Sequence, residues 1–143
     1  MSIQDIIERK GSIVETISAS ASAKAAADRM REKKIAALIV TDGNTIDGII
    51  SEREIVRAIS LHGASFFSLR VGEVMSRDLV TAGPGDSVKR AMKLMTQFRA
   101  RHLPVLRDGA LAGIVSIGDV VKNRLEDLEL ETNVLRDAYL AAH

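Results

Sequence analysis

The amino-acid sequence predicts a mixed α/β fold made of two β-α-β-β-α repeats, followed by a long C-terminal helix. Three observations support this prediction: an internal repeat, apolar residues at strand and helix spacing within each copy, and the absence of Gly and Pro after Gly118. A repeat of about 50–60 residues is marginal as an independent fold. We therefore expect the two copies to pack sheet against sheet, with pseudo-two-fold symmetry and the helices outside.

The repeat becomes visible when the chain is shifted on itself by 65 residues. Residues 14–59 then align with residues 79–124 without a gap, and eleven of the 46 pairs are identical. Ser22/Ser87, Gly48/Gly113 and Ser51/Ser116 are among them. A match of this length indicates duplication of one structural unit. We divide the chain into a first repeat at 1–62 and a second at 63–143, each with its own lead-in segment.

The residue pattern of each copy predicts the same order of strands and helices. The first strands are expected at 14–17 and 79–82, and the paired strands at 37–40 with 46–50 and at 102–106 with 111–115. Helices should begin at Ser22 and Ser87, whose hydroxyls suit the first position of a helix. Second helices should cover 51–61 and 116 to about 141. Turns are expected at Asp42-Gly43-Asn44 and Asp108-Gly109, because these residue types tolerate positive φ.

The lead-in segments and the last helix extend the two repeats. Residues 3–7 and 71–75 share an apolar pattern and are expected to form short helices that pack on the copy that follows. Phe98 is expected in the core. The last helix carries an apolar seam of Val121, Leu125, Leu128, Leu135 and Tyr139, with Thr132 in the gap. Docking on its own domain and packing on a partner are both open for this seam, and we favour a homodimer contact.

Composition excludes several classes of function. The chain has 143 residues, with 20 Lys and Arg against 19 Asp and Glu, so its charge of +1 argues against a general nucleic-acid binder. It has no Cys, which removes disulfides and thiol nucleophiles. The longest strongly apolar run, 35–40, is far shorter than the ~20 residues of a membrane helix. The start lacks a signal-peptide pattern. We expect a cytoplasmic protein with no membrane partner.

Several segments resemble one known family. Residues 48–54 (GIISERE) and 113–119 (GIVSIGD) resemble the end of the CBS motif, which is Gly, two apolar residues, Ser or Thr, two variable residues and Asp. Residues 101–106 (RHLPVL) resemble the strand of that motif, and Val74-Met75-Ser76 resembles its lead-in. The chain is thus similar to a stand-alone tandem CBS pair, or Bateman module. The resemblance implies adenine-nucleotide binding in clefts between the copies, disc-shaped dimers and regulation rather than catalysis.

Ser116 and Asp119 are the leading candidates for nucleotide binding. Ser116 stands where a strand becomes a helix, so its hydroxyl and the free helix-start amides favour an anion. Asp119 lies one turn later, and a carboxylate there can accept from both ribose hydroxyls. The alternative is a capping pair that only starts the helix. The resemblance favours ribose binding by this pair. It also implies that Arg101 and His102 reach the phosphate. The alternative for Arg101 and His102 is an exposed pair at a strand edge.

The remaining candidates surround this pair or repeat it in the first copy. We expect Thr81, with Val80 and Ala82, to form the wall beside the adenine, and Leu103 and Pro104 to cover the base. The matching candidates of the first copy are Thr16, Ser51 and Arg53, where Arg53 either contacts phosphate or forms a surface ion pair. That copy has Glu54, Ala36 and Ala37 in place of Asp119, Arg101 and His102. We therefore expect a strong site at Ser116/Asp119 and a weak or empty one at Ser51/Glu54.

The leading functional hypothesis is an adenine-nucleotide-binding regulatory module that senses energy or redox state as a homodimer and acts on a partner that it regulates. AMP is the favoured ligand, with ATP, ADP or NAD(H) as alternatives. The second hypothesis is a CBS-like scaffold or interaction dimer with degenerate sites. No enzyme is expected, because the sequence has no Walker loop and no nucleophile elbow. Its three histidines, at 62, 102 and 143, lack metal-ligand spacing, so no metal site is expected.

Overall fold

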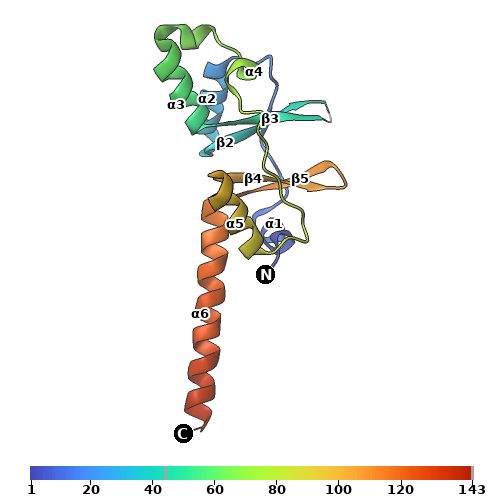
Figure 1. The fold of residues 1–143 in the computed structure, drawn as a ribbon, viewed down its shortest axis with the longest axis vertical. Helices are drawn as coiled ribbons and strands as arrows, with labels where there is room; N and C mark the ends of the chain where they lie inside the picture. Colours follow the sequence, from blue (N-terminus) through green and yellow to red (C-terminus); the bar gives the residue numbers. More distant parts are fainter. Residues whose placement is uncertain (44, 143) are drawn as a thin grey trace. The chain divides into compact units, whose positions relative to one another are not determined.

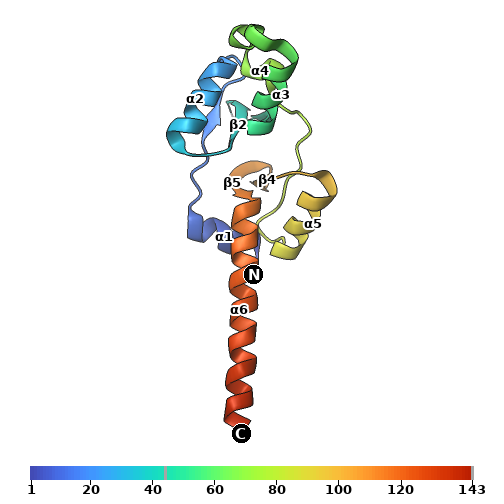
Figure 2. The same cartoon turned by 90° about the vertical axis from the view of Figure 1, so that its left-hand side faces the viewer.

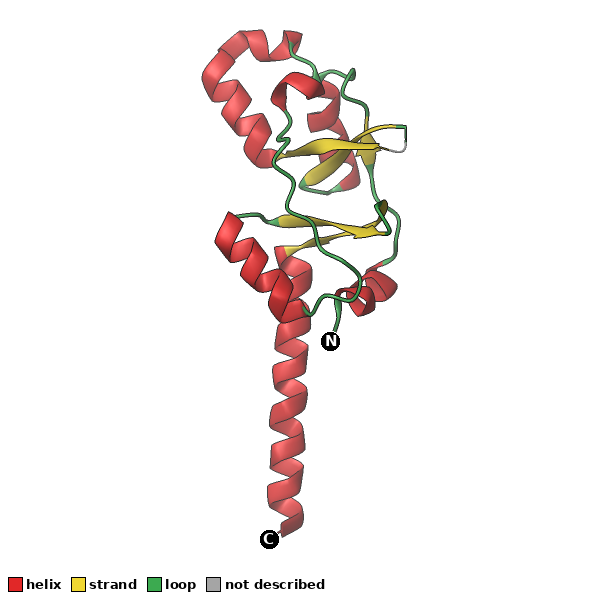
Figure 3. Ribbon diagram, turned by 45° about the vertical axis from the view of Figure 1, so that its right-hand side comes forward, coloured by secondary structure: helices red, strands yellow, loops and turns green. Residues whose placement is uncertain are grey.

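The computed structural model describes residues 1–43 and 45–142, which form two compact units (Figure 1). The first-repeat unit is Ile13–Leu79, and the second-repeat unit combines Met1–Ser12 with Val80–His143. Each unit has a small sheet with helices covering one face, as the secondary-structure colouring makes clear (Figure 3). The predicted mixed α/β fold with a long C-terminal helix is confirmed.

The first-repeat unit has a three-stranded sheet. Its elements are β1 (Thr16–Ile17), α2 (Ala23–Lys33), β2 (Ala37–Asp42), β3 (Thr45–Ser51), α3 (Glu52–His62), the 3-10 helix η1 (Gly63–Ser68) and α4 (Val71–Val74). β1 pairs parallel with β2, and β2 pairs antiparallel with β3. The hydroxyl of Ser22 accepts from the Ala25 amide at 3.0 Å and begins α2 as predicted. Gly43 has a φ of 62°, whereas its expected turn partner Asn44 lies outside the described residues.

The second-repeat unit has the same plan with one strand fewer. Its elements are α1 (Ile3–Lys10), α5 (Val88–Phe98), β4 (His102–Arg107), β5 (Ala110–Ser116) and α6 (Ile117–Ala142). The strand expected at 79–82 is reduced to a single parallel bridge between Ala82 and Val105. Asp108 and Gly109 both have positive φ, at 50° and 80°, which confirms the predicted hairpin turn.

The lead-in helices pack on the opposite repeat from the one predicted. Ile3, Ile6 and Ile7 of α1 are buried in the core of the second-repeat unit, together with Val88 and Leu103. Val71 of α4, which precedes the second repeat in the sequence, is buried in the core of the first. The prediction that each helix packs on the copy that follows is therefore wrong. The compact units also differ from the predicted segments 1–62 and 63–143, since each lead-in helix belongs to the other unit. An apolar helix face does not specify which of two similar cores will bury it.

α6 contacts its own unit only near its beginning. Val120 and Asn123 are buried, whereas all residues from Leu128 to Ala142 are exposed. Figure 2 shows this part of the helix extending beyond α1 and α5. Phe98, expected in the core, is instead 54% exposed at the last position of α5, where the helix ends with Arg99 in the left-handed region. Within the two described ranges, no helix has both the length and the apolar character needed to cross a membrane.

Candidate functional site

The predicted phosphate and ribose residues of the second repeat come together at one end of the β4–β5 hairpin. His102 and Ser116 are directly paired across the two strands. The Ile117 amide donates to the carbonyl of Arg101 at 2.8 Å, which joins the start of α6 to the residue before β4. Arg101 is exposed and His102 is half-buried. The hairpin register therefore gives a single location to candidates that lie about 15 residues apart in sequence.

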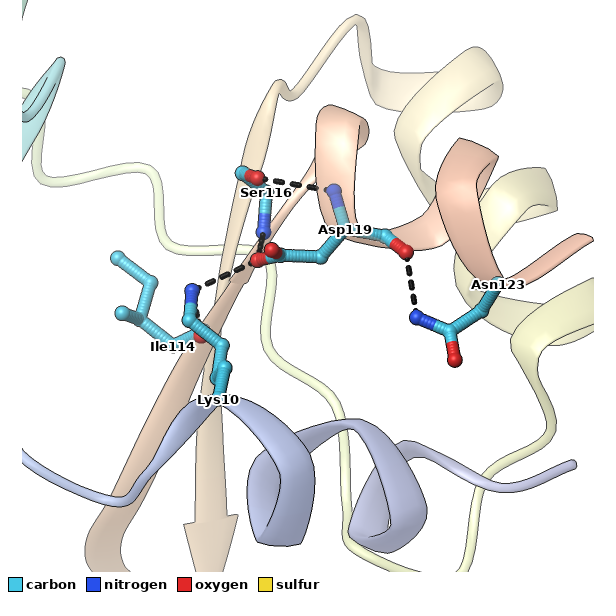
Figure 4. A network of polar contacts seen from close by, with 5 residues as sticks. All are labelled: Lys10, Ile114, Ser116, Asp119 and Asn123. Carbon is cyan, nitrogen blue, oxygen red and sulfur yellow. Dashed lines mark hydrogen bonds and ion pairs between the residues drawn. The ribbon is translucent and has the colours of Figure 1, made fainter. Parts of the chain in front are cut away.

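Ser116 and Asp119 form a reciprocal pair at the start of α6. The Ser116 amide donates to Oδ2 of Asp119 at 2.8 Å, and the Asp119 amide donates to the Ser116 hydroxyl at 3.2 Å (Figure 4). This is the capping arrangement that we gave as the alternative to ribose binding. The hydrogen bonds from the Ser116 amide and from Lys10 both end on Oδ2 of Asp119. Ribose binding by Asp119 stays a prediction.

Lys10 is the residue of this site that sequence reasoning missed. Its ammonium lies 2.6 Å from Oδ2 of Asp119 and donates to the carbonyl of Ile114 at 3.1 Å (Figure 4). Lys10 is the last residue of α1, so the exchange of the lead-in helices brings it here. Under the 65-residue offset it corresponds to Met75. The site of the second repeat therefore has a cation that the same position of the first repeat does not supply.

A buried amide holds α1 against α6 beside this ion pair. Asn123 donates through Nδ2 to the carbonyl of Asp119 at 2.7 Å, and its Oδ1 accepts from Arg9 at 3.2 Å. Arg9 also forms an ion pair with Glu126 at 3.0 Å. The 65-residue offset aligns Asn123 with Ala58. A polar residue in place of a small apolar one on a helix face was the signal that could have indicated this contact.

The charge on Asp119 is stabilised by its neighbours. Burial raises the pKa of Asp119, but hydrogen bonds from Lys10 and the Ser116 amide, with the charge of Lys10, outweigh burial and hold that pKa below the ordinary 3.8. Since the unfolded chain binds more protons near pH 3.8, the contribution of Asp119 to stability is complete above that pH. It is lost as the pH falls through the folded-state pKa.

Replacement of Lys10 by Met tests this arrangement and recreates the residue that the first repeat has. We expect Lys10→Met to raise the pKa of Asp119, because burial remains while the strongest compensating interaction is lost. An NMR titration of the Asp119 carboxyl carbon measures the change. Arg9→Met is the matched control, since Arg9 contacts Asn123 and Glu126 instead. An Asp119 pKa unchanged by Lys10→Met would contradict the ion pair.

The residues expected around the adenine base divide between two faces of the sheet. Leu103 is fully buried in the core of its own unit, and its contact with a base stays a prediction. Pro104 follows it and lies on the other face, since side chains alternate along a strand. Ala82 is also a core residue, and β4 uses both of its backbone groups: its amide donates to Pro104 and its carbonyl accepts from Leu106. Both backbone groups of Ala82 are thus bonded to β4, and contact of Ala82 with a base stays a prediction.

Val80 and Thr81 complete the expected adenine wall. Val80 is partly buried and packs against the core of the unit, so its side chain is directed to the interior. Thr81 is half-buried and is not among the core residues. Pro104 is fully buried, although it does not belong to the apolar core cluster of the unit. Contact of Thr81 and Pro104 with a base stays a prediction.

The corresponding residues of the first repeat form a similar but differently occupied corner. Ala37 pairs with Ser51, and the Glu52 amide donates to the carbonyl of Ala36 at 3.1 Å, as in the second repeat. Oε1 of Glu54 accepts from the Ser51 amide at 2.9 Å and from its hydroxyl at 2.6 Å. The longer acid therefore folds back on the start of α3.

Two further candidates of the first repeat lie close to this corner. Thr16 pairs with Ile39 at the edge of the sheet, which matches the place of Thr81 beside Pro104. The backbone amide of Arg53 donates to the Ser51 hydroxyl at 3.3 Å, so Arg53 belongs to the first turn of α3. Arg53 lies in the first-repeat unit, whereas Arg101 and His102 lie in the second.

Comparison with known proteins agrees with the duplicated fold. The CBS domain family matches residues 3–61 and 71–126. A mitochondrial CBS domain-containing protein of Arabidopsis thaliana is 42% identical over 65% of this chain, and the alignment spans only 48% of that protein. A CBS domain-containing protein of Bacillus subtilis is 31% identical over 80% of this chain and 81% of its own length. The crystal structure of a CBS-domain protein from Agrobacterium tumefaciens is 38% identical and has a TM-score of 0.85, covering 87% of this chain and 99% of that one. With its duplicated sequence, its two similar units and these matches, the chain belongs to the CBS domain family and carries two CBS domains.

Proposed function

We propose that this protein is an adenine-nucleotide-binding regulatory module that acts as a homodimer and senses energy or redox state. The observation that carries the proposal is the convergence of Arg101, His102, Ser116 and Asp119 at one end of the β4–β5 hairpin in a CBS-domain pair. CBS-domain pairs are in general regulatory modules that can bind adenine nucleotides. The chemistry of these four residues fits that class.

Each part of a nucleotide has a complementary group in this cluster. Oδ1 of Asp119 accepts from the vicinal ribose hydroxyls, while the ammonium of Lys10 donates to a ribose oxygen. The guanidinium of Arg101 binds phosphate through two parallel hydrogen bonds, and His102 adds a further donor. Few cations are available here, so the cluster suits one phosphate group and favours AMP over ADP, ATP and NAD(H). Thr81 and Pro104 are the candidates for contact with the base.

The two repeats are proposed to differ in affinity. In the first repeat, Glu54 is bound to Ser51 through the same carboxylate oxygen twice, and alanines replace the two basic residues. Met75 stands where the second repeat has Lys10. The Ser51/Glu54 corner therefore has less charge to offer a nucleotide, and we propose one strong site per chain.

A scaffold without a ligand is the competing function, and one observation favours it. Both Ser–acid pairs are already satisfied by their own helix starts, and Lys10 neutralises Asp119. A chain that never binds nucleotide would show these same contacts. In that case the protein would act only through its dimer surfaces, among them the exposed Val56 and Ile59 of α3.

Thermal unfolding with a panel of adenylates separates the two functions. AMP, ADP, ATP, NADH and S-adenosylmethionine are each added in excess, with 2′-deoxy-AMP as the matched control that lacks one ribose hydroxyl. A ligand at 100 times its Kd stabilises the folded state by about 2.7 kcal/mol, which raises the melting temperature by several degrees. We expect AMP to give such a shift and 2′-deoxy-AMP a smaller one. No shift with any adenylate would favour the scaffold.

A further inference from the structure

The outer part of α6 has an apolar surface that its own unit does not cover. Leu125 is 55% exposed, Leu135 71% and Tyr139 64%, and all residues from Leu128 onward in the described helix are exposed. This part of the helix extends beyond the rest of its unit (Figure 2). Helices in proteins gain most of their stability from packing of an apolar face, so we expect this surface to pack against a partner.

The spacing of the apolar residues is that of a coiled coil. One seam recurs at intervals of four and three residues and consists of Val121, Leu125, Leu128, Thr132, Leu135 and Tyr139. An alternating four-three spacing keeps one face directed towards a second helix over several turns. The Thr132 hydroxyl donates to the carbonyl of Leu128 at 2.9 Å, so this polar atom needs no partner from a second helix. Leu130, Val134 and Leu140 lie outside the seam.

The charges beside the seam fit a second copy of the same helix in parallel. In a parallel, in-register pair, Arg124 faces Glu129 of the partner subunit, and Glu131 faces Arg136 of the partner subunit. Symmetry repeats both contacts, so all four are between opposite charges. In the antiparallel arrangement that overlaps the two seams fully, Glu129 and Glu131 each face their own copy, and Lys122 faces an arginine. These contacts are all between like charges.

We propose that α6 pairs with α6 of a second copy as a parallel, in-register two-stranded coiled coil from Val121 to Tyr139. The proposal rests on the homodimer of the proposed function but not on its nucleotide site. The charges beside the seam identify the partner as a second copy of α6, because a helix of another sequence would have to carry the same pattern of charges. The paired seam is about 27 Å long, at 1.5 Å per residue.

Single cysteines test the orientation, because the natural chain has none. Leu125→Cys and Tyr139→Cys are oxidised separately and analysed on non-reducing gels. A parallel pair places each residue against its own copy, so both variants should form disulfide-linked dimers. No single antiparallel register brings both positions against their own copies. Leu130→Cys, on the outer face of the same helix, is the control and should remain uncrosslinked.

The outcomes test separately the orientation of the two helices, the face of α6 that forms the contact and the existence of the dimer. Cross-linking at Leu125 or Tyr139 alone would overturn the parallel register, and cross-linking at Leu130 would overturn the seam. A monomer of the natural chain by analytical ultracentrifugation would overturn both the homodimer and the coiled coil, whereas the adenylate panel would still report on the nucleotide site.

Arg124→Glu should weaken the dimer roughly tenfold, because two ion pairs become repulsive by symmetry, and adding Glu129→Arg should restore it. Equal affinities for the single and double variants would contradict the proposed charge pairs.

Discussion

Replacement of Asp119 by Ala is expected to raise the Kd for AMP by about 10- to 100-fold, because hydrogen bonds to a charged group contribute roughly 1.5–3 kcal/mol. The variant removes the carboxylate proposed to hold the ribose and also removes the partner of Lys10. Isothermal titration calorimetry measures the affinity and the number of sites per chain. The cost to the fold should be modest, about 1 kcal/mol for the acceptor that the Ser116 amide loses, because the Ser116 hydroxyl still accepts from the amide of residue 119.

The first repeat supplies the matched control for this experiment. Glu54→Ala makes the same kind of change at the corresponding position, where the carboxylate is bound to Ser51. We expect it to lower the stability of α3 by a similar amount and to leave the strong nucleotide site unchanged. Asp119→Ala that binds AMP as the natural protein does would show that the site is elsewhere. Equal losses from both variants would indicate two equivalent sites.

The second large effect is expected from Gly48→Ala, which should destabilise the first-repeat unit by about 1–3 kcal/mol, the range for overpacking a tight interior. A Cβ on Gly48 would lie 2.4 Å from the carbonyl oxygen of Ser76. That oxygen accepts from the Ile49 amide at 3.0 Å, and the Ser76 amide donates back to Ile49 at 2.8 Å. A methyl group there must separate two paired backbone segments, and no side-chain rotation can relieve the contact.

Gly113→Ala is the equivalent change in the second repeat and should cost less. Its Cβ would also lie 2.4 Å from its nearest atom, but that atom is Cδ1 of Ile7, at the end of a rotatable side chain. We expect a loss of about 1 kcal/mol or less, within the range of changes that a core accommodates by repacking. Urea unfolding of the two variants measures the difference. A larger loss for Gly113→Ala would mean that α1 cannot adjust against β5.

The sequence was sufficient for the helix starts and for the hairpin of the second repeat, which depend on neighbouring residues. Ser22 and Ser87 start α2 and α5 as predicted, because a capping hydroxyl acts on amides three residues away. The pairing of His102 with Ser116 follows from the length of one hairpin with a turn at Asp108-Gly109. Local chemistry therefore predicted the cluster at the end of β4 and β5. The aligned residues also show that the two corners differ in charge, and the difference in nucleotide affinity that we infer from this stays a prediction.

Tertiary structure alone decided what surrounds Asp119. Lys10 is 109 residues away in sequence, and it reaches the carboxylate because α1 buries its isoleucines in the core of the second repeat. The two repeats have similar apolar cores, so the pattern of α1 could not indicate which of them it would join. Leu103 likewise had to be seen in the folded chain to be assigned to the core. Packing depends on the shape of two surfaces that meet, and a single sequence describes each surface without saying which ones meet.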